Sequence, residues 1–423
     1  MTRSRVAAAL LFALLGTAAV LFGDRPTGDN GDAPQIAADI ADPVARGAYL
    51  ALAANCRGCH TARAGVAYAG GRAIPTPFGT FYAPNITPDD DTGIGRWDAD
   101  DFWRALHEGR GDGGEPLYPV FPYTHYTKLT RRDADAMFAY LRSLPAERRE
   151  NRGHALRFPY DQRWMLAGWR ALFFTPGVYA ADADRGAQWN RGAYLVQGLG
   201  HCGACHEARN ALGAIRSREH PAGGIVLDWY APALDVAREA GLHDWTHEQA
   251  VALLRDGQAN GASTLGPMAE VVHDSLQHLE AEDLDAMVTY LQALPARDPA
   301  PSPPAPATDA TIAASRERGG VLYRDHCADC HGRRAEGRSP AAPALAGNRA
   351  LTMDSAVNPI RAILYGGFAP GTHAVPEPFG MPPFSAELDD QQIADILNWL
   401  RRDSAAAVVR DYDVRRQRTG PLW

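Results

Sequence analysis

Three pentapeptides in this chain place two cysteines and a histidine in the same order. They occupy residues 56–60, 202–206 and 327–331, and each reads C-x-x-C-H. This spacing is typical of c-type haem attachment, because two thiols one short turn apart add to the two vinyl groups of one porphyrin while the adjacent imidazole ligates the iron. The pattern predicts three covalently bound haem c groups. The attachment residues would be Cys56, Cys59, Cys202, Cys205, Cys327 and Cys330, and the proximal iron ligands His60, His206 and His331.

Zinc is the main alternative for cysteine and histidine at such short spacing. A structural zinc site closes with four protein ligands, commonly from paired C-x-x-C units. Here each unit carries its own histidine, and the three units lie far apart in the sequence. All six cysteines fall within the pentapeptides, so none remains for a disulfide. We therefore interpret the pentapeptides as haem sites.

The composition is that of a globular chain with several domains. Of its 423 residues, 46% are hydrophobic and 22% are charged, which is ordinary for soluble domains. The formal net charge of -8 argues against nucleic acid as a partner, because phosphate binding requires a basic surface.

The N-terminus has the features of an export segment. Arg3 and Arg5 precede an uninterrupted run of apolar or small residues from Val6 to Phe22. Such a run fits either a cleavable signal peptide or an uncleaved membrane anchor, so residues 1–25 are assigned to one of the two. Either assignment predicts that the bulk of the chain is periplasmic, and we expect it to be attached to the periplasmic face of the inner membrane.

Sequence repeats predict the fold class. Before each haem motif lies a helical pattern with a small residue close to an aromatic one, and after each comes a terminal helix that contains an aromatic residue. The order of helix, haem motif, long loop and terminal helix occurs three times. It resembles class I cytochrome c domains. We therefore expect an all-α protein of three tandem class I cytochrome c domains, at 42–147, 185–296 and 312–403.

Three further segments separate or follow these domains. Residues 148–184 are rich in aromatic side chains and should pack between the first two domains or against another subunit. Residues 297–311 form a proline-rich linker, which predicts an extended and semi-rigid spacer. Residues 404–423 are expected to be a loose surface tail.

The distal ligand of each iron decides what the haem can do, because methionine raises the reduction potential whereas an open position permits small-molecule chemistry. Met268 and Met381 lie in proline-flanked loops downstream of the second and third motifs and are the predicted ligands there. The first domain has Phe121 at the corresponding place. His125 is then the nearest competent ligand, with a five-coordinate iron as the alternative. Met137 is expected in the core, and His107 on a solvated helix face.

With these residues placed, the chain resembles the triple-haem cytochrome c subunit of bacterial membrane-bound dehydrogenases of the alcohol, gluconate, sorbitol, fructose and aldehyde types. The resemblance rests on the segments 77–80, 85–88, 92–97, 117–119, 122–124 and 266–272, and on the connection 158–174. Phe121 departs from the pattern, since the better-known members have methionine there.

The resemblance implies an electron-transfer subunit rather than an enzyme in its own right. Its partner would be a catalytic dehydrogenase subunit with flavin, pyrroloquinoline quinone or a molybdenum cofactor, and its acceptor ubiquinone or a terminal oxidase. Two alternatives stay open: a haem enzyme of the peroxidase or small-oxide reductase type working at the first haem, and a stand-alone soluble carrier.

Overall fold

The computed structural model describes residues 34, 36–37, 40–216, 223–259, 261–297, 309–338 and 342–418. The N-terminal segment 1–25 lies outside these residues, as does most of the linker 297–311. Within the described ranges, no helix combines the length and the apolar character needed to cross a bilayer.

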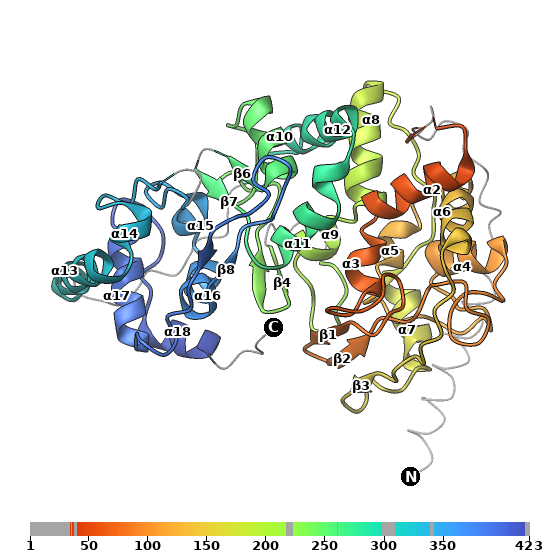
Figure 1. Cartoon of the computed structure of the whole chain (residues 1–423), viewed down its shortest axis with the longest axis horizontal. Helices are drawn as coiled ribbons and strands as arrows, with labels where there is room; N and C mark the ends of the chain where they lie inside the picture. The colour runs from red at the N-terminus through yellow and green to blue at the C-terminus, as the bar shows by residue number, and fades with distance from the viewer. Residues whose placement is uncertain are drawn as a thin grey trace, which may run out of the picture.

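Each haem motif lies in its own helical unit (Figure 1). The first unit contains α2 (Pro43–Ala53), α3 (Cys56–His60), β1 (Ala73–Thr76), β2 (Gly79–Tyr82), α4 (Ala99–Glu108), α5 (Tyr123–Tyr126) and α6 (Arg131–Ser143). The connection adds β3 (Ala155–Leu156) and α7 (Met165–Phe173).

The second unit contains α8 (Ala187–Tyr194), η1 (Leu195–Leu199), α9 (Gly203–His206), β4 (Gly224–Val226), β5 (Trp229–Ala231), α10 (His247–Asp256), β6 (Gln258–Ala259), β7 (Ala262–Ser263), α11 (Pro267–Asp274), η2 (Leu276–His278) and α12 (Ala281–Gln292). The third contains α13 (Asp309–His326), α14 (Ala328–His331), α15 (Arg349–Thr352), α16 (Val357–Tyr365), β8 (Gly367–Phe368), β9 (Gly380–Met381), α17 (Asp390–Leu400) and α18 (Asp411–Arg418).

In every unit a glycine lets the helix before the haem motif cross closely over the terminal helix of the domain, which is α6, α12 or α17. A Cβ atom on Gly47 of α2 would lie 1.8 Å from the carbonyl oxygen of Ala136 in α6. The corresponding distances are 1.9 Å for Gly192 against α12 and 1.9 Å for Gly319 against α17. No side chain fits in these spaces, so the sequence repeat of glycine beside an aromatic residue reflects one packing geometry used three times.

The first two units are joined by two equivalent tyrosine contacts. Tyr49 of α2 donates to Asp283 of α12 at 2.5 Å, and Tyr194 of α8 donates to Asp133 of α6 at 2.6 Å. Each tyrosine oxygen also accepts a backbone N–H from the residue that caps the facing helix, at 3.1 Å and 3.0 Å respectively. The two units therefore face each other as an approximate twofold pair, and we call these contacts the reciprocal tyrosine contacts.

The third unit joins the second by different contacts and lies at the far end of the molecule from the first (Figure 1). The Asn358 side chain accepts from the Tyr230 backbone N–H at 2.9 Å and donates to the Tyr230 carbonyl at 2.7 Å. The Arg361 guanidinium lies 5.5 Å from the centre of the Trp229 ring. Val321 occupies the position of Tyr49 and Tyr194 and is half exposed.

The helical core is as predicted, but two expectations need correction. Short antiparallel ladders, β1-β2-β3, β4-β5, β6-β7 and β8-β9, interrupt the all-α architecture. Their strands of two to four residues are too short to give an alternating pattern in the sequence.

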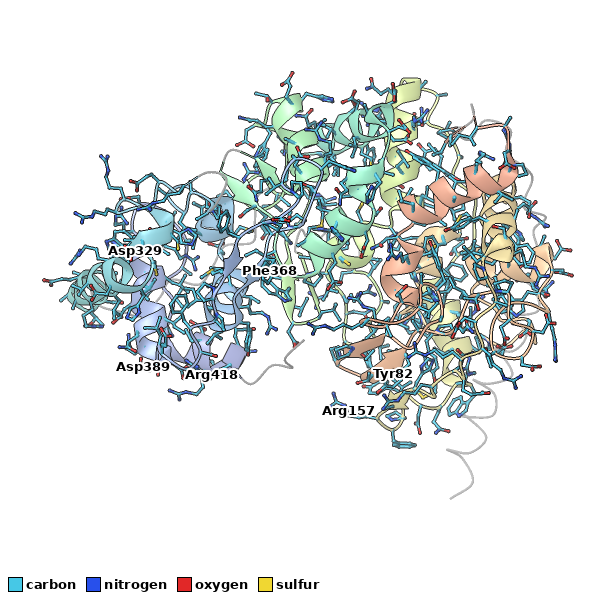
Figure 2. All side chains as sticks on the ribbon, in the orientation of Figure 1. Tyr82, Arg157, Asp329, Phe368, Asp389 and Arg418 are labelled. Carbon is cyan, nitrogen blue, oxygen red and sulfur yellow. The ribbon has the colours of Figure 1, made fainter. Side chains whose placement is uncertain are left out.

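The C-terminal segment is also ordered up to Arg418, not a loose tail. Val409 and Val414 are buried, and α18 packs on α16 and α17. Arg418, labelled in Figure 2, donates to Asp390 and to the carbonyl oxygens of Ser385 and Leu388. Residues 419–423 lie outside the described part of the chain.

Candidate haem-binding sites

Each of the three motif histidines makes an equivalent hydrogen bond to a proline carbonyl, and this bond orients the imidazole for iron. The Nδ1 of His60 donates to the Pro84 carbonyl oxygen at 2.8 Å, that of His206 to Pro232 at 2.6 Å, and that of His331 to Pro343 at 3.0 Å. A proton held on Nδ1 leaves the lone pair of Nε2 free to bind a metal. Burial also lowers the pKa of His60 and of His206, which favours the neutral, ligating form.

The cysteines are available for covalent attachment. All six are free thiols. Burial, with a smaller effect from the neighbouring cysteine, raises the pKa of Cys56 to about 12 and that of Cys327 to about 11. The thiols of Cys56 and Cys327 are therefore neutral at physiological pH.

The predicted methionine ligands lie in short regular elements rather than in loops: Met268 in the first turn of α11 and Met381 in β9. Met268 follows Gly266, whose φ of 58° belongs to the left-handed region, and the Trp229 ring packs on that glycine. Met381 lies in β9 and pairs with Gly367 of β8. Both methionines are partly buried and pack against a hydrophobic core. Their assignment as iron ligands stays a prediction.

The distal loop of the first unit contains aromatic residues instead of methionine. The centre of the Phe121 ring lies 5.5 Å from that of Tyr126. The Tyr126 hydroxyl donates a hydrogen bond at 3.0 Å to the carbonyl oxygen of Ala54, which precedes Cys56 by two residues. Met137 is fully buried in α6, consistent with the core position expected for it. No methionine therefore replaces Phe121 in the described part of this loop.

The side chain of His125 contacts the second unit. Its Nδ1 donates to the Gln197 carbonyl at 3.0 Å, and its ring packs on Gly203, between the cysteines of the second motif. Burial, then the neighbouring His201, lowers the pKa of His125 to about 4. Ligation of the first iron by His125 stays a prediction. The contacts with Gln197 and Gly203 place the imidazole between the first and second motifs.

The expectation for His107 is wrong. It is buried, stacks on Trp103 with ring centres 4.4 Å apart, and donates from Nδ1 to the Thr127 carbonyl at 2.9 Å. The sequence placed it at a solvated helix end because its equivalent in the second unit is Arg255. The loop carrying Thr127 covers that end of α4.

Sequence reasoning missed the residues that connect the sites. Arg72 donates to the carbonyl oxygen of Gly58, inside the first motif, at 2.7 Å and pairs with Glu270 of α11 at 2.5 Å. It thereby links the first haem motif to the helix that carries Met268. Tyr126 lies 5.2 Å from His201, the residue before Cys202, so it bridges the first and second motifs. The one sequence signal for such interdomain contacts is the segment R-G-A-Y, which occurs at residues 46–49 and 191–194 and contains Tyr49 and Tyr194.

Paired free thiols beside an oriented imidazole fit covalent haem c, and helix-pair units built around them define a c-type cytochrome. The family model for cytochrome c matches residues 44–145 and 316–403. The cytochrome c subunit of the quinone-type alcohol dehydrogenase of Gluconobacter oxydans is 34% identical, over 97% of this chain and 87% of that subunit. The gluconate 2-dehydrogenase cytochrome c subunit of Pantoea cypripedii is 35% identical over 88% of each chain.

A nicotinate dehydrogenase subunit of Pseudomonas putida is 39% identical over 88% of this chain, which spans only 31% of that longer protein. The chain belongs to the family of cytochrome c subunits of dehydrogenases, and its role is electron transfer.

Proposed function

We propose that this chain is a periplasmic electron-transfer subunit that holds three haem c groups in three tandem class I cytochrome c domains. It accepts electrons from a catalytic dehydrogenase subunit and passes them to ubiquinone or a terminal oxidase. The observation that carries the proposal is the threefold recurrence of free cysteine pairs beside a histidine whose Nδ1 donates to a proline carbonyl.

The chain's own residues would hold and tune the cofactors. When bound, haem iron supplies a one-electron couple. Cys56 with Cys59, Cys202 with Cys205 and Cys327 with Cys330 would attach the three porphyrins. The proline carbonyls keep each imidazole in one orientation and make it a better electron donor. Met268 and Met381 would complete the second and third sites and raise their potentials.

The relatives support a dehydrogenase as the partner, while its cofactor and the electron acceptor are part of the proposal. The names of the relatives include quinone-type alcohol, gluconate, fructose and nicotinate dehydrogenases. A flavin, pyrroloquinoline quinone or molybdenum partner is therefore consistent with them. The predicted export segment supports a location at the periplasmic face of the inner membrane.

Isolation of the native complex from membranes tests this function. We expect a large catalytic subunit to co-purify, and its substrate to reduce three haem equivalents per copy of this chain in the absence of oxygen. Recovery of this chain alone in soluble form would contradict the subunit role, and fewer than three haems would contradict the domain assignment.

A second function is favoured by one observation, the presence of Phe121 where the second unit has Met268. Without a methionine, the first iron would offer an open site for peroxide or a small oxide. Rapid binding of carbon monoxide or cyanide to one haem of the intact chain would support this enzyme role. Three slowly reacting low-spin haems would exclude it.

A further inference from the structure

The connection between the first two units exposes an unusual amount of apolar surface. Of the nine residues of α7, only Leu166 is buried. Phe158 is 81% exposed, Leu172 70% and Trp164 69%, and Tyr160, Met165 and Phe173 are also exposed. Isolated apolar residues are common on protein surfaces, but several large exposed apolar side chains within one short segment indicate a surface that binds something.

Contacts link part of this apolar surface. Tyr160 packs on Phe78 with ring centres 4.7 Å apart, and Phe78 contacts Gly213. The next residue back, Leu212, is exposed, and its carbonyl accepts from the Trp169 indole at 2.9 Å. Trp169 in turn lies 5.6 Å from Phe173. We call residues 157–174 with Leu212 the aromatic surface. β3 and α7 place it along the lower edge of the first unit (Figure 1), and Figure 2 shows Arg157 at that edge.

The charge of the aromatic surface is opposite to that of the whole chain. Residues 157–174 contain three arginines and one aspartate, whereas the formal net charge of the chain is -8. Arg157 donates to the Pro77 carbonyl at 2.8 Å, Arg163 to the Pro116 carbonyl at 3.0 Å, and Arg170 to the Glu108 carbonyl. Within the described part of the chain none of the three pairs with a carboxylate. The Arg170 guanidinium packs on the rings of Tyr123 and Phe174, whereas Arg157 and Arg163 are exposed and can face an anionic surface.

Tryptophan, tyrosine and arginine around exposed leucine and phenylalanine are the side chains that favour the boundary between lipid headgroups and acyl chains. The aromatic surface contains no residue of the three haem motifs, so it suits attachment rather than electron exchange. A predicted anchor at residues 6–22 would hold the body close to lipid, because about 14 residues from Gly23 to Ile36 span at most roughly 50 Å.

We propose that the aromatic surface inserts into the interface of an anionic phospholipid membrane, with Phe158, Trp164 and Leu172 among the acyl chains and Arg157 and Arg163 at the headgroups. This inference rests on the proposed periplasmic location and names a second membrane contact besides the N-terminal segment. It would fix which face of the first unit points to the bilayer.

Spin labels on the full haem-loaded chain test the insertion. All native cysteines would be consumed by haem, so Leu172→Cys gives one labelling site on the aromatic surface. Val321→Cys gives a control on the half-exposed face of the third unit. On vesicles of phosphatidylcholine and phosphatidylglycerol, the label at 172 should become accessible to oxygen and protected from a water-soluble nickel complex, while the label at 321 stays in water. A label at 172 that remains accessible to nickel would overturn the proposal.

Substitutions separate the apolar contribution to vesicle binding from the electrostatic one. The triple change Phe158→Ser, Trp164→Ser and Leu172→Ser should weaken vesicle binding by at least about tenfold. Changing the exposed Phe368→Ser and Phe379→Ser of the third unit should leave it unaltered. Each of Arg157→Gln and Arg163→Gln should lower the preference for anionic over neutral vesicles by about fivefold.

Failure of this inference is distinguishable from failure of the proposed function. The triple variant should keep its three haems and still be reduced by the purified dehydrogenase subunit in detergent. Should the label at 172 become protected only when the dehydrogenase subunit is added, the aromatic surface belongs to that protein, and the lipid proposal is wrong while the subunit role stands.

Discussion

The first two units and the third unit contain the same helix crossing but use it differently. In the first and second units, an arginine of the first helix pairs with an aspartate of its own unit. The tyrosine three residues later donates a hydrogen bond to the equivalent aspartate of the other unit. Arg46 pairs with Asp133, which Tyr194 also contacts, and Arg191 pairs with Asp283 at 2.5 Å, which Tyr49 also contacts.

The third unit satisfies its aspartate internally. Asp395 accepts from Arg318 at 2.7 Å, from Ser315 at 2.6 Å and from Gln391 at 2.8 Å. Val321 has no hydroxyl to offer a neighbouring unit. The comparison indicates that the same repeat has two uses. At one end it forms a fixed pair of units, and at the other a single unit that docks on the second unit through side chains of α16.

Removal of a shared aspartate should have the largest effect. Asp133→Ala leaves the buried Arg46 and Tyr194 without their acceptor, and loss of one partner of a buried ion pair costs about 3–5 kcal/mol. Because Asp133 serves both units, hydrogen exchange of the haem-loaded chain should increase in the first and second units together.

Asp395→Ala is the matched variant in the third unit. Arg318 is largely exposed there, so water compensates for the lost pair and the faster exchange should stay within α13 and α17. Equal loss of protection in all three units with either variant would contradict the distinction between the pair and the single unit.

The reciprocal tyrosine contacts should have the next largest effect. Burial, with the adjacent aspartate, raises the pKa of Tyr49 and of Tyr194, so both hydroxyls are protonated donors. Tyr49→Phe and Tyr194→Phe each remove a hydrogen bond to a charged acceptor, at about 1.5–3 kcal/mol of unfolding free energy. Denaturant unfolding of the holo chain measures this loss. Val321→Tyr, on a half-exposed surface, should change stability by no more than about 0.5 kcal/mol.

Removal of the Asn358 contact, which docks the third unit on the second, should have the smallest effect on stability. Asn358→Ala removes two hydrogen bonds to the Tyr230 backbone, which together contribute about 1–3 kcal/mol. The Tyr230 amide should then exchange faster, while the haem spectra stay unchanged. An unaltered exchange rate at Tyr230 would show that Arg361 and the neighbouring loops hold the unit without Asn358.

The sequence predicted what is local and missed what depends on long-range contacts. The haem motifs and the repeated helix pairs follow from short patterns. Gly109 and Gly257, which adopt positive φ directly after α4 and α10, are further local signals of where a helix ends. The Tyr49–Asp283 contact joins residues 234 positions apart, and no periodic pattern encodes such a pairing.

The errors have the same origin. His107 and residues 404–418 looked solvated because their polar side chains gave no hint of the covering segments. The aromatic connection was expected to pack either between the units or against a partner, and the structure divides it: Trp169 and Phe174 contact the body, whereas Phe158, Trp164 and Leu172 are exposed.

A reductive titration of the natively purified chain, followed by visible absorption, tests the central claim most directly. The account predicts three one-electron steps per chain, with one haem at a lower potential than the other two because Phe121 stands where the others have Met268 and Met381. Fewer than three steps, or three haems at one common high potential, would contradict it.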